Sequence, residues 1–163
     1  MLNILTIFKK ELRSYFNSPI AYIFLVVFLV IMNWLFFRAF FLVGQVSMRS
    51  FFGILPWIFL VFIPALSMRL WSEEKREGTM ELLFTLPVRD IEAVLGKYKA
   101  VLAFLAITLA LTAPTTITVA ALGNVDGGEI LGGYLGALLL GGALLAFGSF
   151  ISSLTKNQIV AFL

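Results

Sequence analysis

The chain has 163 residues, of which 61% are hydrophobic and only 13% are charged, and its mean hydropathy is +1.02. A water-soluble domain of this size could not bury so much apolar surface, so the composition predicts a membrane protein. The absence of cysteine and histidine excludes disulfides, thiol nucleophiles and histidine bases, and we expect neither a catalytic residue nor a metal site.

The first predicted element is an amphipathic interfacial helix over residues 2–17. Its apolar residues recur at spacings of three and four, and its basic residues fall elsewhere. The apolar set is Leu5, Phe8, Leu12, Tyr15 and Phe16, and the basic set is Lys9, Lys10 and Arg13. Pro19 predicts a break before the next helix. This helix is interpreted either as a simple anchor in the lipid bilayer or as an elbow that transmits cytoplasmic motion to the first span.

Four apolar stretches are long enough to cross a membrane: residues 20–37, 51–70, 100–122 and 130–151. Prolines inside the second and third stretches are tolerated in lipid, and those in the second predict a kink. Residues 159–163 turn apolar again and are interpreted as the start of a fifth span. The predicted fold class is therefore all-α: one polytopic transmembrane helical bundle covering residues 1–163.

The basic residues indicate the orientation of these spans. Ten of the twelve Lys and Arg residues gather on one side, and only Arg38 and Arg49 fall on the other. Because cytoplasmic loops are enriched in Lys and Arg, the N-terminus and residues 69–99 are predicted to be cytoplasmic, in a multi-pass protein of the cell (inner) membrane. The net charge of +3 thus reflects topology, and no nucleic-acid partner is expected.

The loop between the second and third spans separates charge from hydrophobicity. A run of charged residues over 73–77 precedes an apolar cluster over 80–86. Gly78 can end the preceding helix, Thr79 can cap a short new helix, and Pro87 stops it. Such a helix suits a groove on a cytoplasmic partner. The alternative is that it lies on the membrane surface with its apolar residues in lipid.

At this loop the sequence resembles the permeases of ABC-2 type ABC transporters. The resemblance rests on residues 73–88 and on Val94-Leu95-Gly96-Lys97, and it extends to residues 9–16 and 147–158. Within the family, the sequence is most similar to the permease associated with bacterial gliding motility. The resemblance implies a six-span subunit, from which this chain departs because it stops where a fifth span begins.

The same resemblance implies the partners. The subunit would pair with a second permease copy or a homologous permease, and two cytoplasmic P-loop ATPase subunits would drive it. The loop would hold the coupling helix that docks on the ATPase, and the interfacial helix would be the connecting helix beside it. The ATPase-coupling residues expected from the resemblance are Glu73, Glu74, Arg76, Glu77, Gly78, Thr79, Met80, Glu81, Leu82, Leu83, Phe84 and Pro87.

Small and polar residues inside the spans are first interpreted as structural. Gly132, Gly136 and Gly141 in the fourth span would let helices pack closely, although a glycine-lined conduit is the alternative. The threonines around Pro114 can bond to carbonyls that the proline frees. Asn33 is expected to bond to another helix.

The source of energy separates the possible functions. The chain has no G-x-x-x-x-G-K-[ST] phosphate loop, so we expect no cofactor on it, with ATP and Mg²⁺ bound by the partner ATPase. The leading hypothesis is the membrane-spanning permease subunit of an export-type ATP-binding cassette transporter. The alternative is a non-transporting membrane anchor or assembly protein that recruits a cytoplasmic partner. A passive channel and an intramembrane enzyme are disfavoured, because neither a selectivity filter nor a pair of nucleophile and base is visible.

Overall fold

The computed structural model describes residues 2–44, 46–68, 70–71, 78 and 89–154. Every element described is a helix: α1 (Leu2–Asn17), α2 (Pro19–Val43), α3 (Arg49–Ser67), α6 (Asp90–Ala110), α7 (Ala113–Leu122) and α8 (Gly127–Leu154). Four helical stretches within this part are long and apolar enough to cross a membrane, namely Pro19–Leu42, Arg49–Ser67, Asp90–Leu122 and Gly127–Leu154. The expected all-helical, four-span architecture is confirmed. The predicted start of a fifth span, at 159–163, lies outside the described residues.

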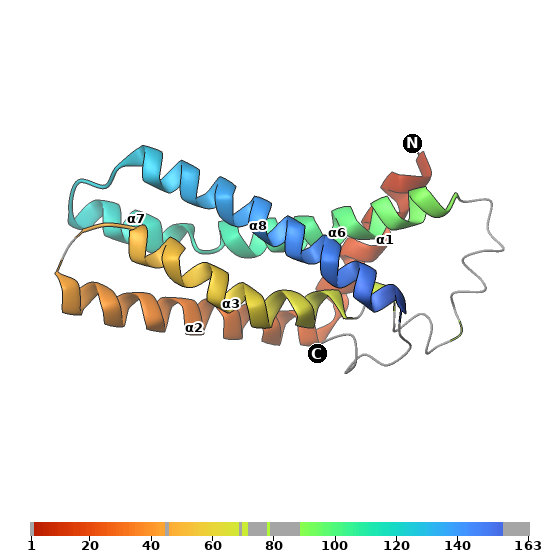
Figure 1. The fold of residues 1–163 in the computed structure, drawn as a ribbon, viewed down its shortest axis with the longest axis horizontal. Coiled ribbons are helices and arrows are strands. Elements are labelled where there is room, and N and C mark those ends of the chain that lie inside the picture. Colours follow the sequence, from red (N-terminus) through yellow and green to blue (C-terminus); the bar gives the residue numbers. More distant parts are fainter. Residues whose placement is uncertain (1, 45, 69, 72–77, 79–88, 155–163) are drawn as a thin grey trace.

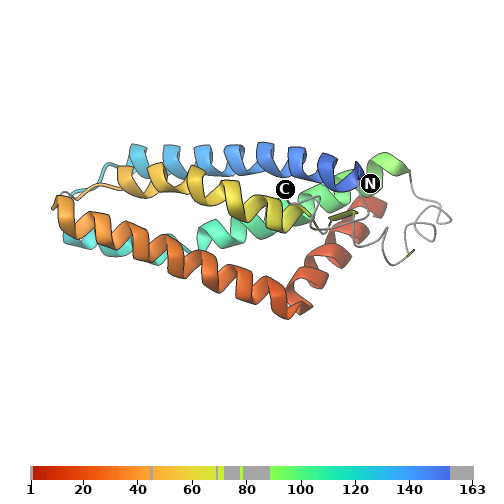
Figure 2. The same ribbon diagram turned by 60° about the horizontal axis from the view of Figure 1, so that its bottom comes forward.

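The spanning helices run side by side along the long axis of the molecule, and α1 crosses α6 at one end (Figure 1). Within this bundle α3 packs mainly against α8, α2 packs against α3, and α6 packs against both α1 and α8. Figure 2 shows α1 running obliquely to α2. The α1 end of the bundle also holds residues 70–71 and the start of α6, whereas the links between α2 and α3 and between α7 and α8 lie at the opposite end.

Aromatic side chains fill much of the interior. Phe28, Phe36, Phe51, Phe59 and Phe104 are at most 1% exposed, and several of them meet edge to face, such as Phe36 and Phe51 with ring centroids 5.4 Å apart. Large apolar side chains also cover the outside of the spans, for example Val30, Trp57 and Leu139, which are 61%, 74% and 74% exposed. Such a surface is suited to lipid contact.

The ends of α2 follow from two residue types. Pro19 is the first residue of the helix, where its missing N–H costs nothing and its fixed φ fits. Gly44 ends it in the left-handed region, with φ at 63°, and donates its N–H to the Phe40 carbonyl over 3.0 Å. The sequence assigned residues 20–37 to this span, so the observed helix extends six residues further toward Gly44.

The apolar stretch 100–122 lies within two helices. α6 begins before it, at Asp90, and the helix breaks at Leu111 and Thr112 before α7 begins. The break lies at Pro114, which has no N–H for the Ala110 carbonyl and stands in the first turn of α7, where proline is well tolerated. By contrast, α3 runs without interruption through both Pro56 and Pro64.

Candidate functional site

Of the twelve residues expected to couple the chain to an ATPase, the structure describes only Gly78. It is exposed and has a φ of 70°, in the left-handed region that favours glycine. The other eleven lie outside the described residues: Glu73, Glu74, Arg76, Glu77, Thr79, Met80, Glu81, Leu82, Leu83, Phe84 and Pro87. The described geometry therefore concerns the residues that precede and follow residues 72–88 in the sequence.

A cluster of buried polar contacts lies at the α1 end of the bundle. We call it the junction, and it comprises Glu11, Tyr15, Met68, Leu70, Trp71, Lys97 and Ser152. Its members come from α1, α6, α8 and the residues that follow α3. Two of its members, Leu70 and Trp71, directly precede residue 72, so the junction includes the end of the second span.

Lys97 is the centre of the junction. It lies two turns into α6 and is only 2% exposed. Its Nζ donates a hydrogen bond of 2.9 Å to the Leu70 carbonyl, lies 3.7 Å from the Glu11 carboxylate, and stands 5.0 Å from the centre of the Trp71 ring. A buried ammonium is tolerated only when it is bonded in this way. Lys97 thereby ties α6 both to α1 and to the end of the second span.

Ser152 makes a second tie, from α8. Its hydroxyl donates to the Met68 carbonyl over 3.0 Å and accepts from the Trp71 N–H over 3.2 Å. Both backbone groups belong to residues that follow α3, and the end of a helix leaves its last carbonyls without intrahelical N–H partners. The side chain of Ser152 is fully buried, so water does not compete for these two bonds.

Two glycines let the helices approach closely enough for these bonds. A Cβ added at Gly96 of α6 would lie 2.7 Å from Ile7 Cγ2 of α1, and one added at Gly148 of α8 would overlap the Ser67 hydroxyl of α3. Real side-chain atoms do not tolerate such distances. Glycine at these two positions is therefore a condition of the junction geometry.

From the sequence, Lys97 was predicted to be one of the cytoplasmic positive charges. The sequence analysis did not predict that Lys97 is buried or that Glu11 is partly buried. A spacing signal was available, because Ala93, Lys97, Ala100, Val101 and Phe104 recur at intervals that place them on one buried face of α6. In α1, Ile4, Ile7, Glu11 and Tyr15 have a similar spacing and are partly buried. The helical period thus indicates that Lys97 and Glu11 face neighbouring helices, whereas their charge alone predicts that they lie on the surface.

The predicted interfacial residues fall into three groups. Leu12, Tyr15 and Phe16 pack against the hydrophobic core, and Phe8 is half-buried. Leu5 is 57% exposed. Lys9, Lys10 and Arg13 are all exposed on the outward side of the helix, as the expected separation of basic from apolar residues requires.

The three glycines assigned to helix packing behave differently from one another. Gly141 is buried, and a Cβ there would overlap Leu105 of α6. Gly132 and Gly136 face open space, with no atom within 4 Å of an added Cβ. Among the described residues, close packing within the chain therefore uses Gly141, together with Gly133, Gly142 and Gly148, and leaves the first pair free on the surface.

A second polar cluster lies inside the bundle beside the α6–α7 break. The Thr115 hydroxyl donates to the Asn33 side-chain oxygen over 2.6 Å and so joins α7 to α2. The Tyr134 hydroxyl of α8 lies 2.8 Å from the hydroxyls of both Thr112 and Thr116. Asn33 thus bonds to another helix, as expected, and only some of the threonines bond to carbonyls of their own helix, such as Thr108 to Phe104.

The described arrangement joins segments of the bundle to one another. No group of three or more His, Cys, Asp or Glu residues within the described part of the chain is placed to hold a metal ion. Residues 70–71 are bonded to α6 through Lys97 and to α8 through Ser152, and Lys97 in turn lies near Glu11 of α1.

Comparison with known proteins completes the description of the site. A family model described as "ABC-2 family transporter protein" matches residues 43–163, which is most of the chain. No curated protein and no solved structure matches it.

Proposed function

Because the chain belongs to the ABC-2 family of transporter proteins, we propose that it is the export-type permease subunit of an ATP-binding cassette transporter, driven by a separate cytoplasmic ATPase. Its family and its four spanning stretches make it a multi-pass membrane permease of an ABC transporter. The proposal adds the direction of transport and the place where the ATPase acts. That place is the coupling segment, residues 73–87.

The observation that carries the coupling proposal is the position of Lys97. In the sequence, the coupling segment lies between Trp71 and Asp90, the first residue of α6. The bond from Lys97 to the Leu70 carbonyl joins the residues before the segment to the helix after it. A force applied to the segment would therefore act on two spans at once.

The proposed mechanism follows from this connection. Nucleotide binding moves the ATPase, the ATPase moves the coupling segment, and the junction passes the displacement to the spans. Ser152 extends the movement to α8, and the ion pair of Lys97 with Glu11 extends it to α1. Since packed helices shift as rigid bodies between discrete arrangements, the spans would rock between two states and alternate access to the substrate.

The proposal includes the remaining partners and the location. The N-terminus and the coupling segment would be cytoplasmic, in the cell (inner) membrane, as the gathering of Lys and Arg at the α1 end supports. A second permease copy or a homologous permease would complete the pathway. The exposed Gly132 and Gly136 would allow such a subunit to approach closely.

The test is copurification with a P-loop ATPase, followed by measurement of that ATPase's activity with reconstituted permease. Leu82→Asp and Leu83→Asp should release the ATPase, because a carboxylate in an apolar docking groove is costly. Asn124→Asp adds the same charge at the opposite end of the bundle and should release nothing. An unchanged complex in both leucine variants would contradict docking through this segment. Binding without any stimulation of ATP hydrolysis would instead support a non-transporting anchor.

A further inference from the structure

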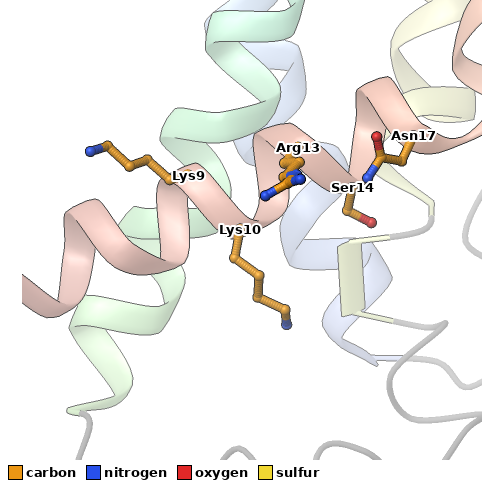
Figure 3. Close-up of a pocket in the computed structure, with 5 residues that line it drawn as sticks. All are labelled: Lys9, Lys10, Arg13, Ser14 and Asn17. Atoms are coloured by element: carbon orange, nitrogen blue, oxygen red, sulfur yellow. The ribbon is translucent and has the colours of Figure 1, made fainter.

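The outward side of α1 carries a basic surface pocket close to the start of the first span. Its volume is about 480 Å³, and Figure 3 shows the five side chains that line it on successive turns of the helix. We call it the basic pocket, and it is lined by Lys9, Lys10, Arg13, Ser14 and Asn17. It is separate from the junction, which lies on the side of α1 that faces α6.

The positive charge of the basic pocket is largely uncompensated. Lys9 and Arg13 form no ion pair with any residue that the structure describes. Lys10 lies 3.3 Å from Glu11, but the same carboxylate oxygen also faces Lys97 at 3.7 Å. The lining groups can all donate hydrogen bonds, and the ammonium and guanidinium groups suit the oxygens of a phosphate. The charges and hydrogen-bond donors of the pocket therefore suit an anion.

Its position relative to the membrane identifies the source of that anion. Asn17 stands two residues before Pro19, where α2 begins, and Ile20 and Ile23 on the first turns of α2 are already 50% and 63% exposed. Lys9 lies about 12 Å along α1 from Asn17 at 1.5 Å per residue, and the helix runs obliquely to α2 (Figure 2). The headgroup region is roughly 5–7 Å deep on each side of a bilayer. Long Lys and Arg side chains span the remaining distance.

We infer that the basic pocket binds the phosphate-bearing headgroup of an anionic phospholipid from the surrounding leaflet. The exposed apolar surface at the start of α2 would contact the acyl chains, which a free phosphate lacks. Three cations also select against zwitterionic headgroups, because a choline or ethanolamine group would bring a further positive charge into the pocket. The inference requires only that the chain spans a membrane, so it stands apart from the docking of an ATPase.

The experiment uses the full chain in detergent with equal amounts of phosphatidylglycerol and phosphatidylcholine, and native mass spectrometry measures the ratio of the two lipids retained. Each Lys or Arg near an anionic lipid surface is worth roughly fivefold in binding. Lys9→Gln with Arg13→Gln removes two such cations and should therefore lower the ratio roughly 25-fold. Arg38→Gln with Arg49→Gln removes the same charge from the opposite end and should leave the ratio within about twofold.

A charge-preserving swap separates recognition from folding. Lys9→Arg with Arg13→Lys should keep the wild-type ratio, and all variants should keep the wild-type melting temperature in zwitterionic detergent, because these side chains are exposed. An equal loss in the two glutamine pairs would overturn the inference, since it would show that net charge alone attracts the lipid.

Two further outcomes would also overturn it. Inorganic phosphate at millimolar concentration should not raise the melting temperature, whereas phosphatidylglycerol should. An equal effect of phosphate would assign the pocket to a soluble anion. If the Lys9 and Arg13 glutamine pair leaves lipid retention intact and releases a copurifying ATPase, the pocket is a protein contact.

Discussion

A lysine inside a helical bundle is costly unless its ammonium is bonded, and Lys97 is bonded on three sides. Its contacts to the Leu70 carbonyl, the Glu11 carboxylate and the Trp71 ring come from two different segments. A buried ion pair is weak evidence of stabilisation relative to apolar residues, but loss of one partner leaves the others uncompensated. Lys97 therefore fixes one arrangement of these segments.

Lys97→Met is expected to lower the free energy of unfolding by roughly 1–3 kcal/mol, because the Leu70 carbonyl loses its donor and Glu11 loses a counter-charge. Thermal unfolding in detergent measures it. Glu11→Gln added to this variant should restore part of the loss, because it removes a partly buried carboxylate that has lost one of its two cations. Lys99→Met is the matched control, since Lys99 is exposed on the same helix. Equal stability of the Lys97 and Lys99 variants would show that the buried contacts contribute nothing.

Glycines in α8 provide a matched pair at the residue scale. Gly148→Ala places a Cβ on the Ser67 side chain and should cost about 1–3 kcal/mol through overpacking. Gly136→Ala enters open space, so stability should be unchanged or raised by up to about 1 kcal/mol, the helix propensity of alanine over glycine. Unfolding midpoints of the two variants make the comparison. Similar midpoints would mean that α3 and α8 can separate at no cost.

At the scale of elements, the break between α6 and α7 is where polar groups of three spans meet. Pro114 lies at the break, and the Thr112, Thr115 and Thr116 hydroxyls bond to side chains on α2 and α8. In lipid, an unsatisfied polar group has no water to bond to. These bonds therefore fix the position of α7 relative to α2 and α8 at the point where the backbone hydrogen bonds of the helix are interrupted.

A double-mutant cycle tests one of these bonds. Asn33→Leu and Thr115→Val each remove one side of the 2.6 Å bond between α2 and α7. The coupling energy should be about 0.6 kcal/mol, and at most about 1.7 kcal/mol, as is typical of interhelical hydrogen bonds in lipid. Unfolding of the two single variants and the double variant in the same detergent gives this energy. Strictly additive losses would show that the two side chains do not interact.

At the scale of the whole molecule, the bundle has two chemically different ends. The α1 end carries the basic pocket, the junction and the start of α6, and the opposite end carries two short links. One of these links is fixed by a bond of 3.1 Å from the Ser47 hydroxyl to Glu129 at the start of α8. Because the two ends differ, labelling one residue at each end can test which end faces the cytoplasm.

Single cysteines can report the orientation, because the chain contains none of its own. A membrane-impermeant maleimide should label Asn124→Cys in intact cells and Lys9→Cys only after the membrane is opened, since both residues are exposed and lie at opposite ends. The reverse pattern would place the junction outside the cell, where no ATP-driven partner could reach it.

The amino-acid sequence alone determined the elements, because span length, proline and glycine positions and the helical period are local properties. It placed a helix over residues 2–17, found four spans and separated the exposed Lys9, Lys10 and Arg13 from the apolar residues of that helix. It also carried the resemblance to the family that the comparison found.

Only the tertiary structure decided which groups meet. Lys97 and Leu70 are 27 residues apart, and Ser152 and Trp71 are 81 apart. No local pattern indicates that these particular pairs share one interior. The glycines show the same limit: residue type predicted close packing equally for Gly132, Gly136 and Gly141, and only Gly141 meets a neighbouring helix within the chain. Whether a small or charged residue lies inside depends on what the next helix presents to it, and that is a property of the packed bundle.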